Sequence, residues 1–139
     1  EIGVRLVGSE MCIRDRQYGF LIPAETETCD TVEIYEAPID AMSGATLRQY
    51  KHDAPWRSVH YLALGGLNHQ PIDYFLQQHP EVRYVSLCFD RDDPGRNFTK
   101  IVAKRLAERG YIVQDTPPAI GKDYNDYLLA ARRLISMER

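Results

Sequence analysis

Short apolar runs that are typical of strands alternate with longer helical segments from Gln17 to the end of the chain. The candidate strands cover residues 18–22, 32–35, 59–64, 83–89 and 111–113. The candidate helices cover residues 38–50, 71–79, 94–109 and a last segment that Asp123 or Asn125 caps and that runs through Leu134. Because strands separated by helical segments of about 10–15 residues build βαβ units, this alternation predicts an α/β domain with a mainly parallel sheet.

The length of 139 residues corresponds to one domain, and a hydrophobic content of 44% is enough for a real core. No apolar run approaches the ~20 residues that a membrane-spanning helix needs, so we expect no membrane association. A net charge of −3 argues against coating of nucleic acid by bulk charge but leaves room for a local basic groove. Cys12, Cys29 and Cys88 have no CxxC spacing, which disfavours structural zinc and disulfides and favours a reducing cytoplasm.

The first sixteen residues lack the periodicity, caps and turns of the rest of the chain. Within them, residues 9–16 look like a translated sequencing-adapter read-through. We therefore expect residues 1–16 to be non-native or disordered, and the natural protein to be longer at its amino end. The alternative is a partly ordered N-terminal strand or arm. Residues 17–139 are expected to form a single domain.

Three acidic residues stand where apolar strands end: Glu36 follows one strand, and Asp90 and Asp92 follow another. Ligands of open α/β sheets bind beyond the carboxyl ends of the strands, where carboxylates from two strands can converge. Asp90 and Asp92 are alternate residues of an extended segment, so both side chains can face one cation. Hard oxygen ligands without His or Cys favour Mg²⁺ over zinc, with Mn²⁺ as the other candidate. The alternative is a helix-capping turn, but Asp93 alone can supply that cap.

Further charged residues are candidates for accessory roles. Asp40 lies one helical turn after Glu36, where it either supports the metal site or favours the helix N-terminus. Lys122 offers a cation for phosphate and Asp123 another carboxylate, although the same residues also read as a capped helix start. A helix stripe that includes Arg96 and Lys100 either steers a nucleic-acid backbone towards the acids or is a solvated face.

Glycine and histidine give weaker signals. Gly65 and Gly66 end a strand, where the absence of a Cβ either permits close backbone approach or serves an ordinary turn. The chain has no GxGxxG or GxxxxGK[ST] motif, so dinucleotide-binding and P-loop functions lack their fingerprints. The four histidines have no spacing typical of metal ligands, which predicts that they are incidental.

The acids, glycines and lysine of these motifs resemble, in their order along the chain, the motifs of the Toprim domain. This domain is the catalytic module shared by bacterial-type primases, topoisomerases, some nucleases and recombination proteins. The residues concerned are Glu36, Asp40, Gly65, Gly66, Asp90, Asp92, Gly95, Lys122 and Asp123. The resemblance covers about residues 30–130. Residues 36–43 and 121–128 look most like the Toprim domains of primase-like proteins of plasmids and conjugative or mobile elements.

The resemblance implies a Rossmann-like Toprim fold with a mainly parallel four-stranded sheet flanked by helices. It implies that Glu36 acts as general acid/base or metal ligand, while Asp90 and Asp92 hold Mg²⁺ for chemistry at phosphorus. Asp123 would complete the acidic cluster, and Lys122 or Arg96 would bind substrate phosphates. The expected partners are DNA or RNA, nucleotides and the other domains of a larger parent protein.

Departures from the family leave three functions open. Full primases carry an upstream zinc-binding module that this chain does not contain, and topoisomerases attack with a tyrosine that we cannot assign here. The leading hypothesis is Mg²⁺-dependent nucleotidyl transfer as the Toprim module of a primase-like DNA-processing protein. The alternatives are a Toprim nuclease and a non-catalytic module that binds nucleic acid or a partner. A phosphatase with an aspartyl nucleophile is disfavoured, because its Asp-x-Asp pair normally follows the first strand.

Overall fold

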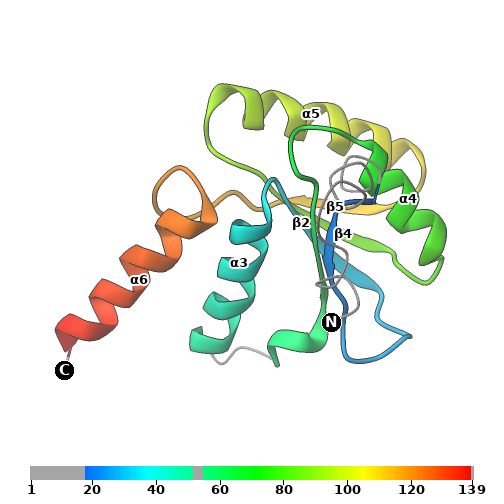
Figure 1. Ribbon diagram of the computed structural model, residues 1–139. Coiled ribbons are helices and arrows are strands. Elements are labelled where there is room, and N and C mark those ends of the chain that lie inside the picture. Colours follow the sequence, from blue (N-terminus) through cyan, green and yellow to red (C-terminus); the bar gives the residue numbers. More distant parts are fainter. Residues whose placement is uncertain (1–17, 52–54, 139) are drawn as a thin grey trace, which may run out of the picture.

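A five-stranded sheet forms the centre of the structure, a computed structural model that describes residues 18–51 and 55–138 (Figure 1). The strands are β1 (Phe20–Ile22), β2 (Thr31–Tyr35), β3 (His60–Ala63), β4 (Tyr84–Cys88) and β5 (Ile112–Asp115). They lie in the order β1-β3-β2-β4-β5. Strands β2 to β5 are parallel, and only the edge strand β1 pairs antiparallel. The predicted mainly parallel α/β fold is confirmed, with β1 as a fifth strand. The proposal for residues 1–16 lies outside the described residues.

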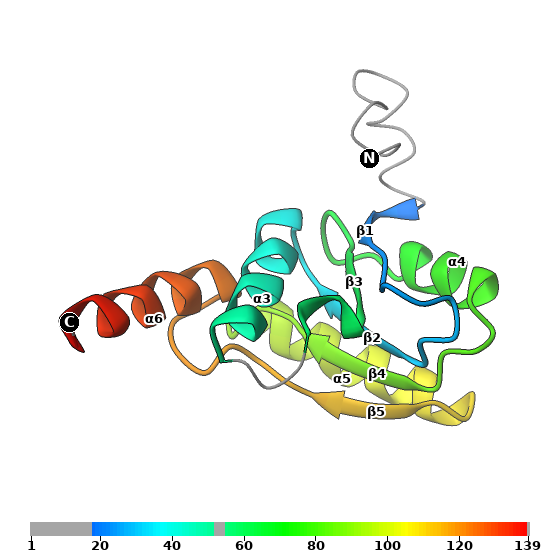
Figure 2. The same ribbon diagram turned by 90° about the horizontal axis from the view of Figure 1, so that it is seen from below.

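Helices cover both faces of the sheet. They are α3 (Pro38–Lys51), α4 (Gln70–Gln78), α5 (Asp93–Glu108) and α6 (Tyr124–Glu138), with a short 3₁₀ helix η1 at Trp56–Ser58. Helices α4 and α5 lie on one face, and α3 and α6 lie on the other (Figure 1). Seen from the α3 side, α6 packs beside α3 and then extends away from the sheet (Figure 2). Within residues 18–51 and 55–138, no helix is both long enough and apolar enough to cross a membrane.

The alternation of side chains along β2 builds the two layers of the core. Val32 and Ile34 are fully buried against the α4/α5 layer, together with Leu87 of β4 and Leu106 of α5. Tyr35 points the other way, into the cluster beneath α3 and α6. Successive strand residues face opposite sides of a sheet, so a central strand covered by helices must be apolar on both.

The chain order places a topological switch point at the carboxyl end of β2. After β2, the chain crosses to β3 on one side of β2 and then returns to β4 on the other side. Such a reversal of strand order is the switch point at which open α/β sheets bind their ligands. Tyr35 of β2 pairs with Cys88 of β4, so the residues that follow these two strands emerge together.

Candidate functional site

Glu36 and Asp90 stand at the switch point, directly beyond the ends of β2 and β4. Asp90 is buried, with 8% of its surface exposed. Glu36 is half-buried, and its buried Oε1 atom has no hydrogen-bond partner within residues 18–51 and 55–138. A buried carboxylate oxygen without a partner is costly, and it calls for a cation or another donor.

A glycine turn fixes the backbone of Glu36. The amides of Gly65 and Gly66 donate to the Glu36 carbonyl, at 2.9 and 3.2 Å. Both glycines have positive φ angles of 73° and 132°, and a Cβ on either would meet nothing within 4 Å. Of the two roles left open by the sequence, the turn is therefore the one that the structure supports.

Gly95 is required for a different reason, since it permits the first turn of α5 to close against Asp90. A Cβ on Gly95 would lie 2.2 Å from the Asp90 carbonyl oxygen and 3.0 Å from Asp92 Oδ1. No larger residue fits without a shift of the backbone. The glycine thus holds the segment from Asp90 to Asp92 close to the helix N-terminus.

Asp92, not Asp93, caps helix α5, so the capping assignment made from the sequence is wrong. Asp92 Oδ1 accepts a hydrogen bond from the Gly95 amide at 2.9 Å. The reason is geometric: Asp92 has the extended backbone of a cap (φ −70°, ψ 170°), whereas Asp93 already belongs to the helix. Asp92 Oδ2 faces Lys122, whose Nζ lies 3.7 Å away. One oxygen of Asp92 is therefore used in the cap and the other remains for a cation.

Asp40 joins the site to helix α6. It is buried on the first turn of α3, and its Oδ1 accepts a hydrogen bond from the Asn125 amide at 3.2 Å. Asp123 Oδ1 accepts a hydrogen bond from the Asp126 amide at 2.8 Å, so Asp123 is the cap of α6. Asp40 therefore supplies a second acceptor to the same helix N-terminus.

Asp126 has a structural role in this region that was not predicted from the sequence. Its Oδ2 accepts a hydrogen bond from the Lys122 amide at 3.0 Å, while the Lys122 carbonyl accepts from the Arg91 amide at 2.8 Å. These bonds tie the loop before α6 to the loop after β4. The three-residue spacing of Asp123 and Asp126 is the spacing of a capping box, so the sequence did contain a signal for this helix start.

Burial and neighbouring carboxylates raise the pKa values of Glu36, Asp40 and Asp90. The pKa of Glu36 is raised to about 7, first by burial and then by the charges of Asp90 and Asp92. The pKa of Asp40 is raised to about 6, chiefly by burial and also by the charge of Asp123. Burial, Asp123 and Asp92 raise the pKa of Asp90, which Lys122 lowers. Crowded carboxylates with raised pKa values and one exposed lysine form an environment that a divalent cation would relieve.

The basic residues near the acids differ in their exposure and in the ion pairs that they already form. Lys122 is 59% exposed and faces the acids. Lys100 is exposed on α5. Arg96 instead makes a two-pronged ion pair with Asp115, with distances of 2.9 and 3.2 Å. A phosphate would have to compete with Asp115 for the Arg96 guanidinium, so Lys122 is the better-placed cation.

A family model described as Toprim-like matches residues 33–128. The primase fragment of the bacteriophage T7 primase-helicase protein is 20% identical, with a TM-score of 0.53, over 78% of this chain and 42% of that one. This likeness shows the same fold. The Aquifex aeolicus primase, comprising zinc-binding and RNA polymerase domains, is 23% identical over 78% of this chain and 26% of that chain, with a TM-score of 0.47. The chain thus spans less than half of either structure, and no curated protein matches it significantly in sequence.

Proposed function

The chain belongs to the Toprim-like family, and on this premise we propose that it is the nucleotidyl-transfer module of a primase-like DNA-processing protein. The observation that carries the proposal is the buried, unpartnered Oε1 of Glu36 beside Asp90 at the switch point of the sheet. The acids there have raised pKa values, and one exposed lysine lies among them. We take residues 17–139 to be the single domain that carries this site.

Glu36, Asp90 and Asp92 would hold Mg²⁺ or Mn²⁺, because the donors are all carboxylate oxygens. Such an ion, when bound, neutralises charge on phosphate oxygens. If Asp90 and Asp92 alone hold the ion, Glu36, whose pKa is about 7 without an ion, would instead accept a proton from a nucleotide hydroxyl and return it near neutral pH. Lys122 would contact substrate phosphates, with Lys100 and Arg96 farther along α5 and with Asp40 and Asp123 supporting the acids.

The proposed partners are nucleic acid, nucleotides and the remaining domains of a larger parent protein. One structurally similar protein is a fragment of a primase-helicase and the other a primase, and the chain covers 42% and 26% of them. We further propose a cytoplasmic protein of a plasmid or other mobile element, from the resemblance of residues 36–43 and 121–128. A Toprim nuclease would use the same acids, so it differs in the product and not in the site.

The metal site is tested by calorimetric titration of Mg²⁺ and Mn²⁺ into the wild type, Asp90→Asn and Asp93→Asn. Asp93 is the matched control, since it is an exposed acid at the first position of α5 with no part in the proposed site. We expect Asp90→Asn to weaken binding at least about tenfold, which corresponds to about 1.4 kcal/mol, and Asp93→Asn to bind like the wild type. Equal affinity of all three proteins would refute the site.

The reaction is tested in the full-length parent on single-stranded templates. We expect labelled nucleotides to be incorporated by the wild type and incorporation to fall at least about a hundredfold in Glu36→Gln, the lower range for loss of an acid/base group. Template cleavage without incorporation would indicate the nuclease instead. If Glu36→Gln has no effect on either activity, the non-catalytic binding module is the better description.

A further inference from the structure

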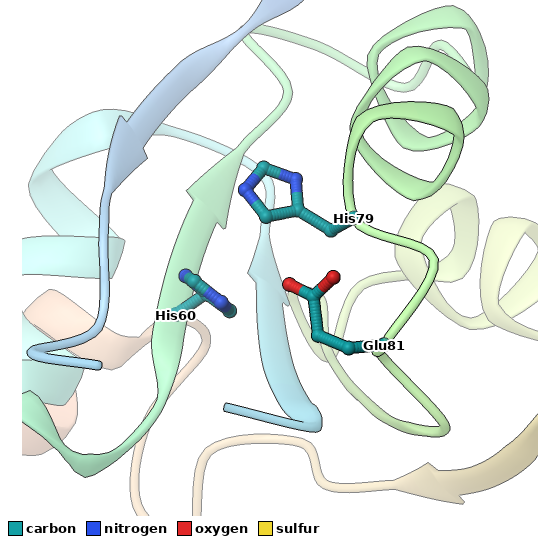
Figure 3. Close-up of side chains that lie close together, drawn as sticks. All are labelled: His60, His79 and Glu81. Atoms are coloured by element: carbon teal, nitrogen blue, oxygen red, sulfur yellow. The ribbon is translucent and has the colours of Figure 1, made fainter. Parts of the chain in front are cut away.

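Two histidines and a glutamate lie together at a place that the acidic site does not use. Figure 3 shows the side chains of His60, His79 and Glu81 facing one another. Potential ligand atoms of the three residues all lie within 4.8 Å of one another. His60 begins β3, His79 caps the carboxyl end of α4, and Glu81 follows in the segment that leads to β4. The prediction that the histidines are incidental is therefore reconsidered for His60 and His79. His52 lies outside the described residues.

This group lies at the opposite end of the sheet from the acids. His60 pairs with Val32 near the start of β2, whereas Glu36 follows the end of that strand. Four residues of strand, at about 3.3 Å each, separate the two levels by about 13 Å. The two groups cannot share one ion, so the inference does not rest on the proposed function.

His79 is held as a metal-binding histidine usually is. Its Nδ1 lies 3.0 Å from the Phe75 carbonyl oxygen. A carbonyl only accepts, so Nδ1 carries the proton and the lone pair of Nε2 is free. The ring also stacks on Phe75, with centroids 4.1 Å apart. A backbone carbonyl that fixes one ring nitrogen is the common support for coordination through the other.

The His60 ring has one buried nitrogen, Nε2, without a hydrogen-bond partner among the described residues. The side chain is buried, with 3% of the residue exposed, and its Nδ1 accepts a hydrogen bond from the Ala24 amide at 3.0 Å. Its Nε2 is buried and makes no hydrogen bond to any residue that the structure describes. Buried polar atoms nearly always have a partner, so Nε2 is an exception, and it gives up no hydrogen bond when it releases its proton to bind an ion beside His79 and Glu81.

A cavity of about 290 Å³ adjoins the three side chains. Glu25 and Glu27 line the same cavity, so further carboxylates and solvent are close to the histidines. The space admits a fourth ligand, either water or one of these acids, and it gives an ion a route from solvent.

We propose that His60, His79 and Glu81 form a Zn²⁺ site. Two imidazoles and one carboxylate are a zinc ligand set that leaves a fourth position open, whereas Mg²⁺ prefers oxygen ligands alone. Zinc bonds of about 2.0–2.2 Å in a tetrahedron bring ligand atoms to about 3.4 Å from one another. Because the ligand atoms already lie within 4.8 Å of one another, each pair needs to approach by at most about 1.4 Å to reach that spacing.

Coordination has a consequence for the loop that carries Ala24. With the Ala24 amide on Nδ1, neutral His60 holds its proton on Nε2. Binding through Nε2 moves that proton to Nδ1 by way of solvent, and the Ala24 hydrogen bond is lost.

The experiment is a titration of the full chain with Zn²⁺, and with Co²⁺ as a spectroscopic probe, for the wild type and four variants. His79→Gln and Glu81→Gln remove ligands, and His69→Gln is the matched control at the other end of α4, where the His69 side chain pairs with Asp73 at 3.1 Å. Asp90→Asn controls for the acidic site. We expect the two ligand variants to weaken Zn²⁺ binding at least about a hundredfold, since loss of supporting groups alone costs about 10–100-fold. The two controls should bind like the wild type.

Two readouts keep the proposal falsifiable. The Ala24 amide resonance should move on addition of Zn²⁺ in the wild type and His69→Gln and stay in place in His79→Gln. Glu81→Gln is the mildest change, and circular dichroism of each variant checks that it folds. Wild-type affinity in both His79→Gln and Glu81→Gln, or loss of Zn²⁺ binding in Asp90→Asn alone, would overturn the proposal.

Discussion

At the scale of single residues, the site is defined by the crowding of carboxylates. Glu36, Asp90 and Asp40 have pKa values above the ordinary range, for which burial is the largest cause in each residue. Without a cation, these groups are harder to ionise in the folded protein than in the unfolded chain, so their ionisation reduces the free energy of unfolding. These acids therefore lower stability at neutral pH when no cation is bound.

The stability of Glu36→Gln should depend on pH in a defined direction. The pKa of Glu36 is about 7 in the folded protein and about 4.5 when unfolded, so the wild type loses stability as the pH rises through this window. Each pKa unit corresponds to about 1.4 kcal/mol, and half-burial reduces the effect. We expect Glu36→Gln to be more stable than the wild type by about 1–2 kcal/mol at pH 8 and by little at pH 4.5.

Urea denaturation in the presence of EDTA at several pH values measures this difference. Glu108→Gln is the control, because Glu108 is an exposed acid at the end of α5. A difference between wild type and Glu36→Gln that stays constant from pH 4.5 to 8 would contradict the prediction.

At the scale of helices and strands, the loops are joined by side chains that cap helices. Asp40 on α3 and Asp123 each accept a hydrogen bond from the first turn of α6. Removing the acceptor at Asp40 leaves the Asn125 amide unpaired at a helix N-terminus. Global stability is a poor measure of this change, because the raised pKa of Asp40 means that its removal also relieves a charge.

Hydrogen exchange at Asn125 isolates the capping contribution. We expect this amide to exchange at least about fivefold faster in Asp40→Ala, since loss of a helix-capping acceptor costs about 1 kcal/mol. Asp40→Asn keeps the acceptor oxygen and removes the charge, so its Asn125 amide should exchange about as in the wild type. Equal exchange in Asp40→Ala and the wild type would show that Asp40 does not hold α6.

Local sequence patterns predicted the helices and strands well, but they assigned the cap of one helix to the wrong residue. Glu36 and Asp90 could be placed at one sheet edge, because parallel strands end on the same side and their apolar runs end visibly. The cap of α5 was misplaced by one residue, since Asp92 and Asp93 are chemically identical and only the backbone distinguishes them. The group of His60 and His79 could not be predicted, because it depends on how α4 packs beside β3.

At the scale of the whole molecule, the two faces of the sheet are built differently. The α4/α5 face has an apolar core, whereas the α3/α6 face contains the charge of Glu33. Glu33 forms an ion pair with Arg48 of α3 and accepts a hydrogen bond from Tyr35 at 2.7 Å. Arg48 also donates to Tyr61 at 3.1 Å. The strand order and this polar layer result from packing between distant segments, so patterns local to one strand did not reveal them.

Loss of one partner of the Glu33–Arg48 ion pair should destabilise the protein, whereas replacement of both residues should be tolerated. Arg48→Met leaves the half-buried Glu33 carboxylate without its cation, which should lower the free energy of unfolding by about 2–3 kcal/mol. In the double variant Glu33→Gln/Arg48→Met the uncompensated charge is gone, so we expect at least half of that loss to be regained. Chemical denaturation of the wild type, both single variants and the double variant measures the coupling. If the single-variant losses simply add, the two residues are not coupled, and the ion pair does not account for the stability of this layer.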